Sequence, residues 1–133
     1  MMKFYELTLL ILIIFTPLKA IESHIVLKVN NEIVTNIDLD TEYKYLIALN
    51  NDLTNIDKET VLKLAKESII REKIKKNELL KYYKFGETEK FLKVIVENFY
   101  KKLNIENLND FEDYLNQYDL KLKIVQDKIE IEM

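Results

Sequence analysis

The stretch from residue 24 to residue 50 constrains the fold most, because it changes from a strand pattern to a helix pattern within a few residues. Aliphatic and β-branched residues fill Ile25–Val29, and Asn30–Asn31 separates this run from a second one, Ile33–Thr35. Asparagine adopts the left-handed backbone conformation at little cost, so an Asn pair between two apolar runs indicates a tight turn. The sequence therefore predicts a short β-hairpin.

A helix is predicted directly after the hairpin. Thr35 and Asn36 are both good N-cap residues, and Asp38 and Asp40 would lie in the first turn, where the helix dipole favours negative charge. One apolar face of this helix would carry Leu39, Tyr43, Leu46 and Ile47. The predicted unit is strand, turn, strand and capped helix.

The pattern VNNEIVTNIDL at Val29–Leu39 resembles the start of the mature N-terminal domain in the SurA family of periplasmic chaperones. The resemblance continues more loosely through the helical patterns up to residue 133, but only its first part is specific. It implies a mainly α fold, in which a short N-terminal β-hairpin is followed by about five helices, as in the trigger-factor/SurA peptide-binding-like class.

Residues 1–20 have the pattern of a secretory signal peptide. Lys3 supplies the positive start, Leu7–Phe15 the apolar core, and Ala20 a small residue before a plausible cleavage site. A membrane anchor is the alternative, but the apolar core is shorter than the roughly twenty residues that span a bilayer. We therefore expect cleavage after about Ala20, export to the periplasm, and a single SurA-like domain over residues 21–133.

A long amphipathic helix is predicted at 58–82, with Asp57 as its cap. Its apolar residues recur at helical spacing and cover more than one side; they are Val61, Leu62, Ala65, Ile69, Ile70 and Ile74. Gly86 is the only glycine in the sequence, and we expect it to end this helix in the left-handed conformation.

Shorter helices are predicted for the rest of the chain. One covers 87–103, and the next begins at Asn109, which would form a capping box with Glu112. A last helix is suggested by the apolar spacing in 122–129, whereas the final KIEIEM alternates and is also compatible with an extended strand.

The residue inventory supports no catalytic, cofactor or metal site. There are 20 basic and 23 acidic residues and a net charge of −3, which disfavours nucleic-acid binding. Cysteine is absent, and the one histidine, His24, lies beside Ser23 and Glu22 near the expected mature terminus, where a triad could not be held in catalytic geometry. We therefore predict no catalytic residue, no cofactor and no metal.

The resemblance implies that the chain binds unfolded outer-membrane proteins through an apolar surface and so assists their folding and assembly. In the family, proline isomerisation belongs to separate parvulin-type domains, for which this chain lacks the residues. The candidate peptide-binding residues are aromatic or lie on the long helix, although each could instead pack in the core; they are Tyr43, Ile70, Ile74, Tyr82 and Tyr83.

Two other functions remain open from the sequence. The chain could be the N-terminal part of a longer parvulin-type peptidyl-prolyl isomerase. It could also be an exported helical structural or adaptor protein that shares only the hairpin and first helix with the chaperones. An uncovered face of the long helix would bind client segments or a second copy of the chain, which would make a homodimer.

Overall fold

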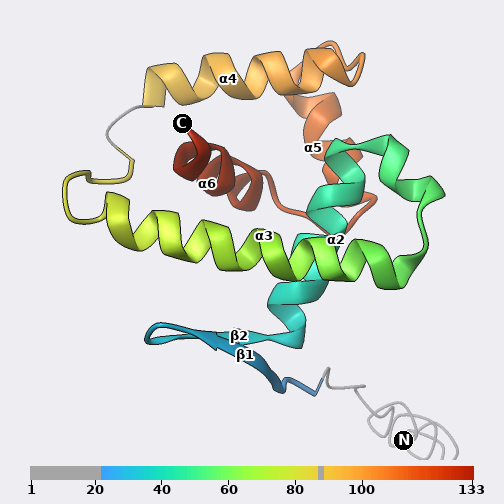
Figure 1. Cartoon of the computed structure of the whole chain (residues 1–133). Coiled ribbons are helices and arrows are strands. Elements are labelled where there is room, and N and C mark those ends of the chain that lie inside the picture. Colours follow the sequence, from blue (N-terminus) through green and yellow to red (C-terminus); the bar gives the residue numbers. More distant parts are fainter. Residues whose placement is uncertain (1–21, 87–88) are drawn as a thin grey trace, which may run out of the picture.

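The computed structural model describes residues 22–86 and 89–133 and confirms a mainly helical fold with a short N-terminal hairpin (Figure 1). Within these residues, five helices and one 3₁₀ turn follow the hairpin; the elements are β1 (Ile25–Val29), β2 (Glu32–Thr35), α2 (Asn36–Leu49), η1 (Asn51–Asn55), α3 (Lys58–Leu79), α4 (Glu89–Lys102), α5 (Leu108–Asn116) and α6 (Leu122–Glu132). The predicted signal peptide at 1–20 lies outside the described residues. Within the described ranges, no helix has the length and apolar character needed to cross a bilayer.

The hairpin forms where it was predicted, because Asn30 adopts a positive φ of 52° and reverses the chain. The two strands pair antiparallel, with Val29 opposite Glu32 and Leu27 opposite Val34. One face of the hairpin packs on α3, where Val29 and Val34 form a small core with Ile69. The other face is open to solvent.

Helix α2 begins with a reciprocal capping box. The Asp38 backbone N–H donates to the Thr35 hydroxyl oxygen at 3.2 Å, and the Thr35 N–H donates to the Asp38 carboxylate at 2.7 Å. Thr35 is therefore the N-cap. The Asn36 side chain instead holds the chain before the hairpin, since its carbonyl oxygen accepts the His24 N–H at 2.8 Å.

Helix α3 is the longest described element; the hairpin lies on one side of it and α4 and α6 lie on the other, whereas α2 crosses it (Figure 1). Asp57 caps it by accepting the Thr60 N–H at 2.9 Å, as predicted. The helix ends at Leu79, short of the predicted end at residue 82, and Leu80 is its C-cap. Gly86 has the expected positive φ of 90°, but it lies in the following loop and does not terminate α3.

The second and larger core joins α2, α4, α5 and α6. Its buried members are Ala48, Val96, Tyr100, Phe111, Leu115, Leu120, Val125 and Ile129. Residues 122–132 are helical, so the final residues KIEIEM do not form the extended strand that the sequence also allowed. Helical spacing brings Val125 and Ile129 close together in this core, whereas an extended chain would place them much further apart.

The predicted cap of α5 at Asn109 is wrong. Asn107 is the N-cap, and its side-chain oxygen accepts the Asp110 N–H at 3.0 Å. The Asn107 amide also donates to the Asp110 carboxylate at 2.7 Å, so two hydrogen bonds tie this cap to the first turn.

Candidate functional site

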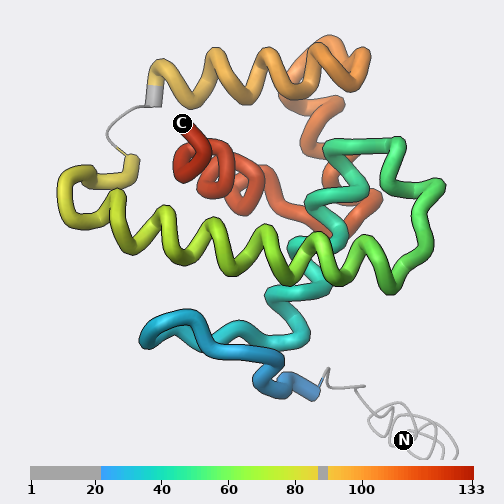
Figure 2. The backbone as a smooth tube through the Cα atoms, viewed as in Figure 1, coloured from blue at the N-terminus to red at the C-terminus, as the bar shows by residue number. Residues whose placement is uncertain are grey.

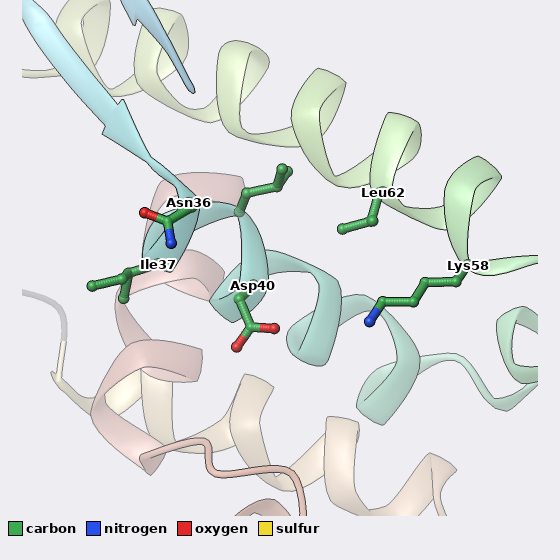
Figure 3. A pocket seen from close by; sticks show the side chains of 6 residues that line it. Asn36, Ile37, Asp40, Lys58 and Leu62 are labelled. Carbon is green, nitrogen blue, oxygen red and sulfur yellow. The ribbon is translucent and has the colours of Figure 1, made fainter. Parts of the chain in front are cut away.

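A cleft of about 420 Å³ lies between the beginning of α2 and the beginning of α3 (Figure 3). We call it the α2–α3 cleft. Three aliphatic side chains, one amide and two charged groups line it: Ile37, Leu39, Leu62, Asn36, Asp40 and Lys58. An apolar hollow with a few polar groups at its rim is the usual form of a ligand-binding site.

The two helix caps bring these residues together. The capping box on Thr35 starts α2 so that Ile37 remains 44% exposed near the mouth of the cleft. The Asp57 cap starts α3 at Lys58, and Leu62 follows at the i+4 position on the same face. Figure 3 shows Lys58 and Leu62 extending from α3 toward α2.

The two charged side chains at the rim, Asp40 and Lys58, differ in whether they form ion pairs. Asp40 forms an ion pair with Lys44 at 2.8 Å, and Lys44 also reaches Asp119 at 3.3 Å. The pKa of Lys44 is raised above its usual value, mainly because Lys44 donates a hydrogen bond to Asp40. Lys58 forms no ion pair with any described residue, and its Nζ lies 5.5 Å from the centroid of the Tyr43 ring. The cleft therefore offers a positive group to a ligand.

Exposed apolar surface adjoins the cleft along the chain. Ile25 and Ile33 are 64% and 52% exposed on the outer face of the hairpin. The register pairs Ile25 with Thr35 and Ile33 with Lys28, so the two isoleucines are diagonal neighbours on that face. From β2 the chain passes directly through the cap of α2 to Ile37 in the cleft. We call Ile25, Ile33 and Ile37 the isoleucine strip.

The five candidate residues predicted from the sequence lie in different environments in the structure. Tyr43 is half-buried beside Lys58, next to the α2–α3 cleft. Ile70 packs against the small core under the hairpin, whereas Ile74, one turn later, is 49% exposed. Tyr82 is 90% exposed in the loop after α3. Tyr83, in the same loop, is half-buried, and its hydroxyl donates to the Glu130 carboxylate at 3.3 Å.

These five residues do not form one surface. Tyr43 lies beside the first residue of α3, and Tyr82 and Tyr83 follow its last turn, so the 22 residues of the helix separate them by about 33 Å. The sequence reasoning treated the hairpin isoleucines only as strand formers. Strand alternation was the available signal, since Ile33 must face away from the buried neighbour Val34.

A second hollow, of about 270 Å³, lies where α2, α4 and α6 meet. Its lining is mostly apolar and consists of Tyr45, Ile95, Phe99, Ile129, Glu132 and Met133. Ile129 belongs to the main core, and Tyr45, Ile95 and Phe99 pack against it. This hollow is therefore part of the helix packing, whereas the α2–α3 cleft leads to exposed apolar residues.

A charged cluster occupies the interior between α2, α3 and α6. The Lys128 ammonium contacts the carboxylates of Glu42 and Glu72, and it lies 5.1 Å from the centroid of the Tyr45 ring. Glu42 is 1% exposed, and no other described residue donates a hydrogen bond to it. Burial lowers the pKa of Lys128, but the two carboxylates outweigh it and leave the pKa above its usual value. The cluster links three helices through one cation.

Comparison of the chain with protein-family models, with curated proteins and with solved structures found no match. In the described part of the chain, no group of three His, Cys, Asp or Glu residues is placed to hold a metal ion. What the chain binds must therefore be inferred from the geometry of its cleft and exposed surface.

Proposed function

We propose that this protein is a periplasmic chaperone domain that holds unfolded segments of outer-membrane proteins and catalyses no reaction on them. The observation that carries the proposal is the continuity of the α2–α3 cleft with the isoleucine strip. Both are apolar, both are open to solvent, and they follow one another along the chain from β1 to α2. A client side chain would enter the cleft while neighbouring client residues cover the strip.

The expected strength of this interaction suits a holding function. Complete burial of an isoleucine side chain contributes about 1.5–3 kcal/mol. The three residues of the strip are 44–64% exposed, so covering them would contribute about 2–5 kcal/mol before the cost of ordering the client. Such a contact is weak and reversible, which allows release without an energy source.

The polar groups around the cleft suit an extended polypeptide. Lys58 can donate to a carboxylate or a main-chain carbonyl oxygen of the client, because no ion pair within the described residues occupies it. The sheet in the described part of the chain has two strands, so each of them also has an edge that no described strand pairs with. An extended client can hydrogen-bond to such an edge while its side chains alternate over the isoleucine strip.

The test compares two single substitutions at matched positions. Ile37→Glu places a carboxylate on the isoleucine strip, and Leu108→Glu makes the same change on a residue that is 42% exposed at the start of α5, away from the cleft. The assay measures how well each protein suppresses aggregation of a urea-unfolded β-barrel protein after dilution. We expect the wild type and Leu108→Glu to suppress aggregation and Ile37→Glu to lose most of this activity. Equal activity of the two variants would contradict the proposed site.

A further inference from the structure

Positive charge is concentrated in one part of an otherwise acidic chain. Residues 73–102 contain nine lysines and four glutamates, a net charge of +5, whereas the whole chain carries −3. The segment comprises the end of α3, the following loop and all of α4. Lys73 and Lys75 pair with Glu32 and Glu132 outside the segment, at 2.7 and 3.5 Å, so the positive charge of the region rests on the remaining lysines.

Helix α4 has apolar residues on the side that faces away from the core. Val96 and Tyr100 are buried against α5 and α6, whereas Phe91 is 70% and Val94 56% exposed. At 100° per residue, Phe91 and Val94 lie on the side of the helix opposite Val96. Exposed Lys90 and Lys93 are their neighbours in the sequence, and exposed Lys101 and Lys102 lie two to three turns further along the helix, where Lys101 pairs with Glu97 at 2.5 Å.

The loop before α4 adds two more exposed apolar side chains, because Leu80 is 53% and Tyr82 90% exposed. Glu130 of α6 holds this loop: its carboxylate accepts the Gly86 N–H at 2.6 Å and the Tyr83 hydroxyl at 3.3 Å. Figure 2 shows that the loop and the beginning of α4 lie at the same end of the molecule. Two hydrogen bonds thus tie the loop that carries Tyr82 to α6.

We propose that this region is a docking surface for an anionic membrane. The basic face, as we call it, consists of Tyr82, Lys84, Lys90, Phe91, Val94, Lys101 and Lys102. Lysine ammonium groups are attracted to a diffuse negative lipid surface, while their aliphatic stems and nearby aromatic rings enter the boundary between headgroups and acyl chains. Lys84 and Lys90 form no ion pair with any described residue, so their charge is available to such a surface.

A membrane explains the surface better than a nucleic acid does. The basic face contains lysine and no arginine, and so lacks the planar fork that binds phosphates bidentately. Its apolar members are aliphatic as well as aromatic, and Val94 offers no ring on which a base could stack. The surface lies on α4 and its preceding loop, apart from the α2–α3 cleft, so one molecule could dock and hold a client together.

The experiment is cosedimentation of the protein with vesicles. We expect binding to phosphatidylcholine vesicles that contain phosphatidylglycerol, weakening of this binding as salt is added, and no binding to phosphatidylcholine alone. Lys84→Glu with Lys90→Glu should reduce the affinity about thirtyfold or more, because each lysine near a lipid surface contributes about a fivefold factor. Phe91→Ser should reduce it at unchanged charge.

The matched control makes the same charge change on α3, outside the basic face, with Lys63→Glu and Lys66→Glu. We expect this pair to reduce vesicle binding much less; an equal loss would show that only net charge matters and would overturn the proposal. Circular dichroism checks that each variant is folded, and Tyr82→Ser provides a second apolar test. Single-stranded DNA and polyglutamate are tested in parallel. If the protein binds either polymer more tightly than it binds the vesicles, and Phe91→Ser does not change that binding, the basic face has a different partner. This result would also overturn the proposal.

Discussion

Replacing Lys128 by methionine should destabilise the fold by about 3–5 kcal/mol, the usual cost of removing one partner from a buried ion pair. Lys128 is 12% exposed and is the cation between Glu42 and Glu72. Methionine preserves most of the aliphatic stem, so the packing against Tyr45 changes little. The loss therefore comes from leaving two carboxylates, one of them 1% exposed, without their counter-charge.

The assay is urea unfolding followed by circular dichroism, in which the variant should unfold at a clearly lower midpoint. Glu42→Gln in the Lys128→Met background removes the buried charge and should restore at least half of the lost stability. Lys123→Met is the matched control, because Lys123 pairs with Asp127 at 2.5 Å on the exposed side of the same helix, and its midpoint should barely change. A Lys128→Met protein as stable as the wild type, or a double variant less stable than the single one, would refute the reasoning.

The Lys128→Met variant should also differ from the wild type in how its free energy of unfolding depends on pH. The pKa of Lys128 is raised above its ordinary value of 10.5 in the folded protein. A raised pKa stabilises the fold fully below the pKa of the unfolded chain, and this contribution disappears as the pH rises through the folded pKa. The stability difference between the wild type and Lys128→Met should therefore be constant near neutral pH and shrink above about pH 10.5. A difference that persists unchanged into strong alkali would contradict this account.

Four further results are expected. Glu130→Ala removes the acceptor of the Gly86 N–H and should lower the free energy of unfolding in urea by about 1–3 kcal/mol. Amide exchange in the loop after α3 should become faster. An unchanged exchange rate would contradict the view that Glu130 holds this loop. Ile70→Glu should abolish helical circular dichroism or lower the melting temperature strongly, because Ile70 packs under the hairpin. Ile74→Glu should remain folded, because Ile74 is 49% exposed. A folded Ile70→Glu protein and an unfolded Ile74→Glu protein would be inconsistent with this packing. Mass spectrometry of the protein from cells should show a chain cleaved after about Ala20, and the purified chain should not accelerate proline isomerisation in a tetrapeptide; an intact Met1, or catalysis above background, would contradict these two expectations.

Features determined by neighbouring residues were predictable from the sequence. The turn at Asn30, the cap at Thr35 and the cap at Asp57 each depend on contacts within a few positions, and the structure confirms them. The cap of α5 was predicted at the wrong asparagine, although its signal is also local. Asp110 lies three residues after Asn107 and exchanges two hydrogen bonds with it.

Features that depend on distant pairs were missed because no local pattern indicates them. The contact of Glu42 with Lys128 joins residues of two helices far apart in the chain, and helical spacing alone predicts neither partner as buried. The loop after α3 depends likewise on a distant residue, because the Glu130 carboxylate of α6 accepts the Gly86 N–H. The α2–α3 cleft exists only because the two helices pack on each other, so its lining could not be inferred from either helix alone.

Site-specific photocrosslinking tests the central claim most directly. A benzophenone amino acid is placed at Ile37 in one protein and at Leu108 in another, and each protein is irradiated with an unfolded β-barrel protein as client. If the α2–α3 cleft and the isoleucine strip hold the client, the Ile37 position should form crosslinks that an excess of unlabelled client abolishes, and the Leu108 position should form few. Equal crosslinking at both positions, or crosslinking at Leu108 alone, would contradict the claim.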